Sequence, residues 1–248
     1  MPKLSVTVIT KDEEENLARA LESVSWADEI VVVDCGSQDG TPDVAYRFTN
    51  RVSVRPWTSY GDQKNHAAEL ASHDWIFSLD ADERVSSELA AEILELIATE
   101  PAHRGYRVPR VAFHLGRWLR STDWYPDFQL RLYDRRAGRW TTPSVHESVK
   151  VPRQVGRLRH ELEHYTYRNL AHQFNTIDRY TTLAANDMAT QGRHVGLIRL
   201  AVHPFLVFLR NYLFRGGIRD GSVGFIVSAM NAHYVFLKFA KLWERRHR

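Results

Sequence analysis

Short apolar runs alternate with stretches of helical periodicity in the first hundred residues. The runs at 4–10, 30–34 and 75–79 are β-branched or aromatic and carry no charge before their last residue, which is typical of strands buried on both faces of a parallel sheet. A weaker run at 52–56 predicts one more strand. Apolar residues between the first two runs follow helical spacing: Leu17, Ala20, Leu21 and Val24. This alternation predicts an open, mostly parallel α/β sheet with helices on both faces.

Acidic residues stand where two of these strands end. Asp34 closes the run at 30–34, and Asp80 and Asp82 follow the run at 75–79. Ligands of open α/β sheets bind beyond the carboxyl ends of the strands. Two alternating carboxylates at such a place can converge on Mg²⁺ or Mn²⁺, which prefer oxygen ligands and substrate phosphates. An ordinary turn-forming role is the alternative for each Asp.

The pattern changes in the second half of the chain. Between 104 and 151, short apolar runs are interleaved with Arg, Trp and Tyr, so we expect irregular strands and loops. Two apolar stretches follow, at 197–214 and 223–240. Both are interrupted by charged or polar residues, and we expect each to fall short of the roughly 20 apolar residues of a membrane span. Flanking arginines favour helices lying on an anionic membrane surface, with ordinary core helices as the alternative.

The total charge of +3 conceals two oppositely charged halves. Residues 1–100 hold 8 basic and 20 acidic side chains, whereas residues 101–248 hold 25 basic and 10 acidic ones. The near-neutral total speaks against a nucleic-acid-binding arm, and we expect no nucleic-acid partner. Among the acids, Glu92 and Glu95 are expected on solvated helix faces. The single cysteine, Cys35, excludes an internal disulfide framework and fits a cytosolic location.

Spaced motifs in residues 4–100 resemble the inverting family-2 glycosyltransferases of the GT-A fold. The segment Thr10-Lys11-Asp12-Glu13 resembles that family's opening motif beside the nucleotide base. The segment from Asp34 to Thr41 resembles the family's DDGSxDGT, with Cys35 in place of the second acid. The resemblance implies that the nucleotide sugar is bound by Thr10, Lys11, Glu13, Asp34, Lys64 and Asp80.

The same resemblance implies roles for two further motifs. Gln63-Lys64-Asn65 stands where the family has a basic residue and Asn preceding a helix, which implies a phosphate contact for Lys64. The triplet Asp80-Ala81-Asp82 resembles the metal-binding motif, with Asp82 the direct ligand and Asp80 nearer the nucleotide sugar. His146 is a further candidate for a metal or phosphate contact.

Beyond residue 100, the order of short motifs resembles the peripheral glucosyltransferases of lipopolysaccharide core assembly. These motifs are GRWL at 116–119, WYPD at 124–127, QLRL at 129–132, VHE at 145–147, HY at 164–165 and RDG at 219–221. The resemblance implies β-transfer of glucose from UDP-glucose to a lipopolysaccharide inner-core glycolipid, peripherally at the cytoplasmic membrane face. We therefore expect a nucleotide-sugar-binding half at 1–100, an acceptor-binding half at 101–166 and a helical, membrane-associating extension at 167–248.

Inverting transfer needs a carboxylate that takes the proton of the acceptor hydroxyl and a cation that neutralises the leaving diphosphate. Glu147 is our first candidate for the base, because it follows a β-type run in the acceptor half. Asp127, in an aromatic turn, is the second. A structural ion pair with a nearby arginine is the alternative role for Glu147.

Three rival functions remain open. A polyprenyl-phosphate glycosyltransferase would use the same donor half but a lipid phosphate acceptor. A non-catalytic nucleotide-sugar binder would need only that half. The segment 160–164, HELEH, matches the H-E-x-x-H pattern of zinc peptidases, although it supplies no clear third ligand downstream.

Overall fold

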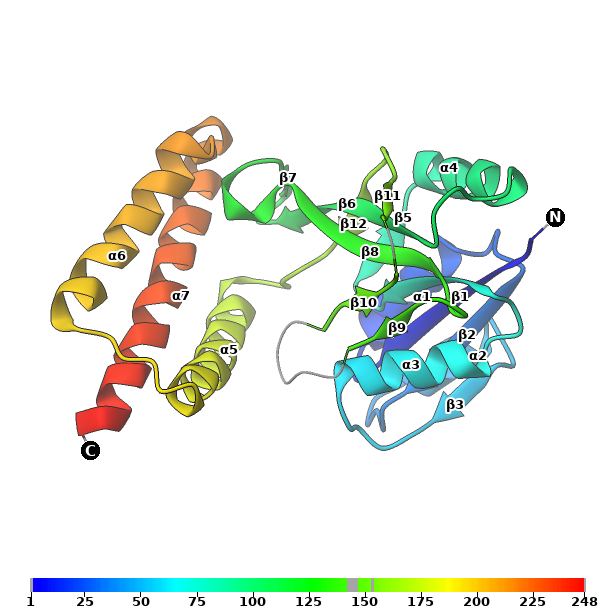
Figure 1. The fold of residues 1–248 in the computed structure, drawn as a ribbon, viewed down its shortest axis with the longest axis horizontal. Coiled ribbons are helices and arrows are strands. Elements are labelled where there is room, and N and C mark those ends of the chain that lie inside the picture. Colours follow the sequence, from blue (N-terminus) through cyan, green and yellow to red (C-terminus); the bar gives the residue numbers. More distant parts are fainter. Residues whose placement is uncertain (1, 142–146, 153, 248) are drawn as a thin grey trace. The chain divides into compact units, whose positions relative to one another are not determined.

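The computed structural model describes residues 2–141, 147–152 and 154–247. The chain forms two compact units (Figure 1). The first comprises Met1–Arg110 and Phe128–His164, and the second comprises Val111–Asp127 and Tyr165–Arg248. The segment 111–127, which we expected within the acceptor half, therefore groups with the C-terminal helices.

The first unit is built on a mixed sheet. Its strands are β1 (Leu4–Thr10), β2 (Glu29–Asp34), β3 (Val52–Val54), β4 (Trp75–Asp80), β5 (Glu83–Val85), β6 (Gly105–His114), β8 (Asp127–Asp134), β11 (Gly156–Arg157) and β12 (Leu162–His164), with the pair β9 (Arg139–Trp140) and β10 (Val149–Lys150) apart from it. The strand order is β3-β2-β1-β4-β8-β6-β12-β5. The first four strands are parallel, as predicted. Between β6 and β8 the chain forms a short strand and a three-residue 3-10 helix, and β8 joins β4 antiparallel.

Helices cover both faces of the parallel strands, as expected. They are α1 (Glu14–Glu22), α2 (Thr41–Tyr46), α3 (Tyr60–Leu70) and α4 (Ser87–Ala98). On one face, Val8 of β1 shares a core cluster with Leu21 of α1 and Leu89 of α4. On the other, Ile9 packs with Ala67 of α3. Neighbouring residues of a strand point to opposite faces, so α3 lies opposite α1 and α4.

Helix α3 corrects one expectation. Gln63-Lys64-Asn65 does not precede a helix but lies inside α3, because the helix already begins at Tyr60. Ser59 caps it by accepting a hydrogen bond from the Asp62 N–H at 3.2 Å. The consequence is that Lys64 and Asn65 are buried rather than at a loop tip.

The zinc-peptidase interpretation is wrong. The chemistry of H-E-x-x-H needs a helix that carries both histidines on one side, but Leu162–His164 forms the strand β12. The two histidines have different partners: His160 Nδ1 lies 2.9 Å from Glu92 Oε2, and His164 Nε2 lies 3.2 Å from Asp82 Oδ2.

Glu92 is not a solvated helix residue as we expected. Its carboxylate, with 12% of the side chain exposed, accepts hydrogen bonds from the backbone N–H groups of Arg159 and His160. Burial by itself would raise the pKa of Glu92, but these hydrogen bonds lower it below the usual value. Glu92 therefore fixes the turn that leads into β12.

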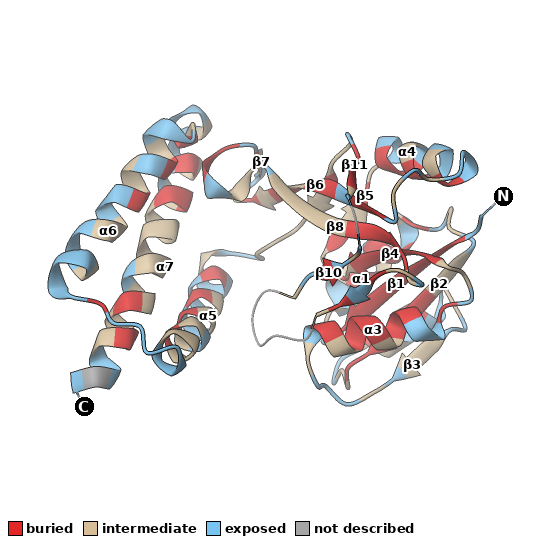
Figure 2. Ribbon diagram, viewed as in Figure 1, coloured by how far each residue is buried: buried red, intermediate tan, exposed pale blue. Residues whose placement is uncertain are grey.

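The second unit is mainly helical, and many residues of its helices are exposed (Figure 2). Its elements are β7 (Arg117–Leu119), η1 (Thr122–Trp124), α5 (Leu170–Thr190), α6 (Leu197–Leu209), η2 (Arg210–Phe214), η3 (Gly217–Asp220) and α7 (Gly221–His247). In the described part of the chain, Leu197–Phe214 and Gly217–Arg245 are each long and apolar enough to cross a membrane, with only 11% and 22% of their apolar windows buried. The expectation that both fall short is thus not supported by length and composition.

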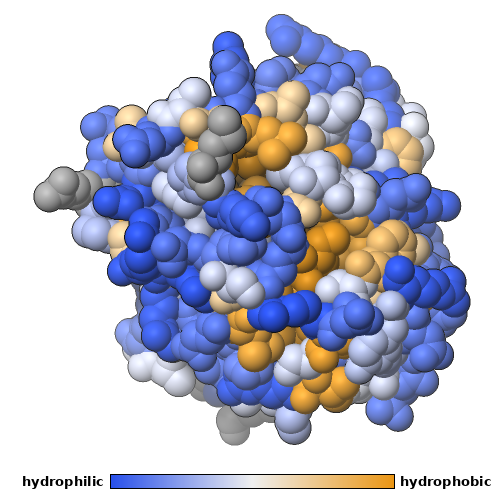
Figure 3. Space-filling view, turned by 90° about the vertical axis from the view of Figure 1, so that its right-hand side faces the viewer, coloured by the Kyte–Doolittle hydropathy of each residue, from blue (hydrophilic) through white to orange (hydrophobic). Residues whose placement is uncertain are grey.

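Apolar side chains also reach the surface elsewhere. Figure 3 shows one face of the molecule on which hydrophobic residues lie among hydrophilic ones. Exposed large apolar residues of the first unit include Tyr46, Phe48, Val54 and Leu94. Such scattered groups are ordinary on protein surfaces.

The position of Glu92 yields a pH-dependent prediction. A carboxylate whose pKa is lowered on folding stabilises the fold above its unfolded pKa, about 4.3, and that stabilisation is lost as the pH falls through the lower folded value. Glu92→Gln should therefore lower the free energy of unfolding by about 1–3 kcal/mol at pH 7. Urea denaturation should show the difference shrinking below about pH 4. A difference that is the same at pH 7 and pH 3 would contradict this role.

Candidate active site at the carboxyl ends of β1, β2 and β4

The strand register brings three motif residues to one edge of the sheet. Thr10, the last residue of β1, is paired with Asp34 of β2. On the other side of β1, Ile9 is paired with Asp80 of β4. Thr10 is buried, and in the described structure its hydroxyl has no hydrogen-bond partner. The expected site therefore has a common floor at the position that open α/β sheets use for ligands.

Asp34 organises the loop that follows β2. One carboxylate oxygen accepts hydrogen bonds from the N–H groups of Gly36 and Ser37, both at 3.0 Å, and the other accepts from the Ser37 hydroxyl. Gly36 has φ +82°, a conformation that favours glycine. Burial raises the pKa of the neighbouring Cys35 thiol to about 11, so this thiol stays protonated and is no ligand for a hard cation.

The two donor-side motifs hold each other in place. The Asp12 N–H donates to the Ser37 hydroxyl at 2.9 Å, and the Gln38 N–H donates back to Asp12 Oδ1 at 2.7 Å. The Glu13 N–H donates to the Thr41 hydroxyl at 2.9 Å. These bonds join segments about 26 residues apart, which explains why both motifs occur together. Lys11 is exposed beside them.

Lys64 is a buried cation between two carboxylates. Its Nζ lies 2.9 Å from Asp80 Oδ1 and 3.3 Å from Glu147 Oε1, and it sits 4.4 Å from the ring centroid of Trp140. Only 3% of its side chain is exposed. The other face of this environment is fixed by Asn65, whose amide exchanges hydrogen bonds with the backbone of Trp140 at 2.9 and 3.0 Å. Lys64 thus places the base candidate beside the donor-side carboxylate.

A second buried cation, Arg131 of β8, completes the charge balance. Its guanidinium binds both Asp80 and Glu83, and Glu83 also pairs with Arg110 at 3.1 Å. Burial by itself would raise the pKa of Asp80, but the charges of Arg131 and Lys64 outweigh it and hold that pKa well below its usual range. Asp80 is therefore ionised, and both of its oxygens are engaged.

Asp82 and His164 form the part of the site that fits a divalent cation. Their side chains are 29% and 15% exposed, and Asp82 Oδ2 lies 3.2 Å from His164 Nε2. Among the described residues, no group of three or more His, Cys, Asp or Glu side chains is arranged to hold a metal alone. Mg²⁺ is commonly held by one or two carboxylates together with substrate phosphates, so a carboxylate and an imidazole suit a cation that arrives with a nucleotide diphosphate.

The remaining predicted residues are placed as follows. Glu147 is 21% exposed and joins the cluster through Lys64. Asp127 begins β8, is partly exposed and belongs to the second unit. His146 lies outside the described residues.

Three members of the cluster were missed as site residues. Arg131 lies in a short motif that we used only for the family resemblance. His164 was considered there and in the zinc-peptidase motif HELEH, but not as a member of this site. Glu83 directly follows the metal-binding triplet. A buried strand that carries an isolated arginine, as β8 does, was the available indication for Arg131.

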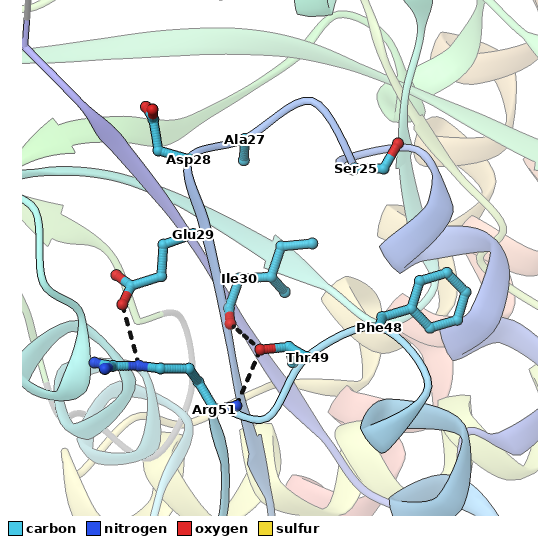
Figure 4. Close-up of a pocket in the computed structure, with 8 residues that line it drawn as sticks. All are labelled: Ser25, Ala27, Asp28, Glu29, Ile30, Phe48, Thr49 and Arg51. Carbon is cyan, nitrogen blue, oxygen red and sulfur yellow. Dashed lines mark hydrogen bonds and ion pairs between the residues drawn. The ribbon is translucent and has the colours of Figure 1, made fainter.

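A cavity of about 430 Å³ lies at the opposite end of β2 (Figure 4). Glu29, one of its lining residues, begins β2, whereas Asp34 ends it. Glu29 pairs with Arg51 at 3.1 Å, and the Thr49 hydroxyl donates to the Ile30 carbonyl at 2.8 Å. The polar groups of this cavity thus satisfy one another, and it is separate from the carboxylate cluster.

Comparisons with known proteins agree with this arrangement. The sequence model of glycosyl transferase family 2 matches residues 5–153. The lipopolysaccharide core biosynthesis glycosyltransferase LpsC of Rhizobium meliloti is 33% identical over 99% of this chain and 94% of its own length.

Two solved structures can be named among those similar to this chain. One is S. aureus TarS 1–349, with a TM-score of 0.49 and 13% identity over 99% of this chain and 92% of that one. The other is glucosyl-3-phosphoglycerate synthase of Mycobacterium tuberculosis in complex with Mn²⁺ and UDP-glucose, with a TM-score of 0.37 and 21% identity over 45% of this chain and 43% of that one. The family match and the full-length relative show that this chain is a glycosyltransferase that belongs to glycosyl transferase family 2.

Proposed function

We propose that this glycosyltransferase moves glucose from UDP-glucose, with inversion to a β linkage, onto a sugar of a lipopolysaccharide inner core. The name of the R. meliloti relative supports the acceptor class, and the resemblance of the donor motifs supports the donor. The observation that carries the proposal is the Lys64 bridge: Lys64 pairs with the donor-side Asp80 and with Glu147, which lies 83 residues further along the chain than Lys64. The reaction is proposed for the cytoplasmic face of the membrane, where nucleotide sugars are available.

The chemistry needs one proton acceptor. In a single displacement, the acceptor oxygen bonds to the anomeric carbon while the bond from that carbon to the diphosphate oxygen breaks. The acceptor hydroxyl proton passes to the Glu147 carboxylate, which is partly exposed and oriented by Lys64. Attack opposite the leaving group inverts the anomeric configuration. Asp127 is the second candidate for this base.

A divalent cation would be held by Asp82 and His164. When bound there, Mg²⁺ or Mn²⁺ supplies the positive charge that stabilises the leaving diphosphate. Both oxygens of Asp80 are already paired, so Asp80 is not assigned to the cation. It is assigned to the nucleotide sugar instead, as the family resemblance implies. His146 as a metal ligand, and Lys64 as a phosphate contact, remain predictions.

The donor pocket is assigned to the loops after β1 and β2. The unpartnered hydroxyl of Thr10 and the exposed side chain of Lys11 are its candidate contacts, with Glu13 and Asp34 shaping the loops. Residues 101–166 are proposed to bind the acceptor.

A polyprenyl-phosphate acceptor is the rival within the same enzyme class, and the two apolar helical segments of the second unit also suit it. Transfer to a phosphate oxygen would not need a base for a sugar hydroxyl. An assay that offers both acceptors in parallel separates the two functions.

Removal of the proposed cation ligand provides the first test. UDP-glucose with Mn²⁺ should raise the melting temperature of the native protein, because a ligand that binds only the folded state stabilises it by about 2.7 kcal/mol at a hundredfold excess over Kd. Asp82→Ala should remove the Mn²⁺-dependent shift and the transfer activity, whereas Asp43→Ala, a surface change on α2, should keep both. Undiminished Mn²⁺-dependent turnover in Asp82→Ala would overturn the site assignment.

Replacement of the base separates chemistry from binding. Glu147→Gln should lower kcat by about 10²–10⁴-fold, the usual contribution of a general base, with little change in UDP-glucose affinity measured by calorimetry. Asp127→Asn is the matched control and should retain most of the activity. If Asp127→Asn loses kcat while Glu147→Gln does not, the base is Asp127.

A further inference from the structure

Helix α6 presents an apolar face to solvent. Its outward side chains follow the i, i+4, i+7, i+8 spacing of one helix face and are 47–82% exposed: Ile198, Val202, Phe205 and Leu206. The opposite side of the helix is also apolar, with Val207 buried and Leu200 packed against a core cluster of the unit. A helix that is apolar all round normally lies in a core or a membrane. We call the four outward side chains the α6 face.

Exposed apolar groups continue beyond α6 in the same unit. Phe214 at the end of η2 is 83% exposed. Other exposed apolar side chains beyond α6 are Leu213, Ile218 and Phe225. An extended set of exposed apolar side chains of this kind marks an interaction surface.

The charge around the α6 face identifies the kind of partner. From residue 188 to residue 219 the chain has five arginines and no acidic residue: Arg193, Arg199, Arg210, Arg215 and Arg219. All five are exposed. Exposed apolar side chains on a segment that carries arginines and no acid of its own complement a lipid bilayer, which has an apolar interior and, when anionic, negatively charged headgroups.

Polar contacts argue that the segment lies along such a surface rather than across it. Helix α6 has 13 residues and continues into η2, so that the helical segment Leu197–Phe214 has 18 residues. At about 1.5 Å per residue it spans about 27 Å against about 30 Å of hydrocarbon, so its polar contacts decide between the two orientations. At its end, Arg210 pairs with Asp123, and Asn211 Nδ2 donates to the same carboxylate at 3.0 Å. Arg215 Nε donates to the Thr122 carbonyl at 3.2 Å. A span would carry this polar network into hydrocarbon, where charged groups are costly.

We propose that the α6 face docks on an anionic lipid bilayer, with helix α6 in the plane of the membrane. The apolar side chains of the face then lie below the headgroups, and the arginines of the segment 188–219 lie at the lipid phosphates. The docked helix continues into η2, and η2 contacts the segment 121–125 through a hydrogen bond from the Asp123 N–H to Asn211 Oδ1. In the same segment, Trp124 donates its indole N–H to Asn231 at 3.0 Å. Docking therefore fixes this aromatic segment relative to the membrane. The inference that this position helps the protein to reach a glycolipid acceptor rests on the proposed function.

The test is co-sedimentation of the full chain with vesicles, with no donor or acceptor present. Vesicles of phosphatidylcholine with phosphatidylglycerol should bind the protein, and pure phosphatidylcholine should bind it much more weakly. The variant Ile198→Ser/Val202→Ser/Phe205→Ser should weaken binding about a hundredfold or more. Leu94→Ser, an exposed apolar change on α4, is the matched control and should bind as the native protein does.

A charge variant guards against misfolding of the apolar one. Arg193→Gln/Arg219→Gln should weaken binding to the anionic vesicles about 25-fold, at about fivefold per arginine, and should keep the native melting temperature. Native-like binding of the apolar or the charge variant would overturn the proposal.

Two other outcomes would also overturn it. One is co-sedimentation that does not depend on salt concentration or lipid charge and is reversed only by detergent, which indicates that the helix spans the membrane. The other is that the native protein binds no vesicles and is a dimer in analytical ultracentrifugation, whereas the apolar variant is a monomer. That result indicates that a second copy of the chain covers the α6 face. Because no substrate is present, failure of transfer activity in a separate assay leaves this result unaffected.

Discussion

The site depends on two buried cations, Lys64 and Arg131, that hold three carboxylates together. Asp80, Glu83 and Glu147 would repel one another at this edge of the sheet, and a buried charge without a partner is strongly destabilising. Lys64 lies between Asp80 and Glu147, and Arg131 lies between Asp80 and Glu83. The cations keep Asp80 ionised, and they give each carboxylate a defined position.

This arrangement divides the labour among the acids. Asp80, Glu83 and Glu147 form a paired frame, whereas Asp82 lies outside this frame, with its Oδ2 at 3.2 Å from His164 Nε2. We therefore expect Asp82 and His164 to bind the cation, while the ion pairs of Lys64 and Arg131 remain in place when the donor binds or leaves. The negative first hundred residues are in this way reconciled with an anionic substrate, because much of their charge at the site is already neutralised.

Local patterns predicted the parallel part of the fold. The uncharged apolar runs predicted β1, β2 and β4, and the strand register places Asp34 and Asp80 at the same end of the sheet, as expected. The roles of these acids in the site stay predictions. The sequence could not show contacts between distant residues, such as Arg131 with Asp80, 51 positions apart. It also misled at HELEH, where pairing of β12 with β5 overrides a helical motif, and at Glu92, whose burial depends on that same turn.

The central claim is that Lys64 brings Glu147 to the donor side of the site. A double-mutant cycle in urea denaturation measures this coupling directly, with Lys64→Met, Glu147→Gln and the double variant compared with the native protein. Because Asp80 is present in all four proteins, its own pairing with Lys64 cancels. The account predicts a coupling free energy of about 1–3 kcal/mol, whereas effects that add to within about 0.5 kcal/mol would contradict it.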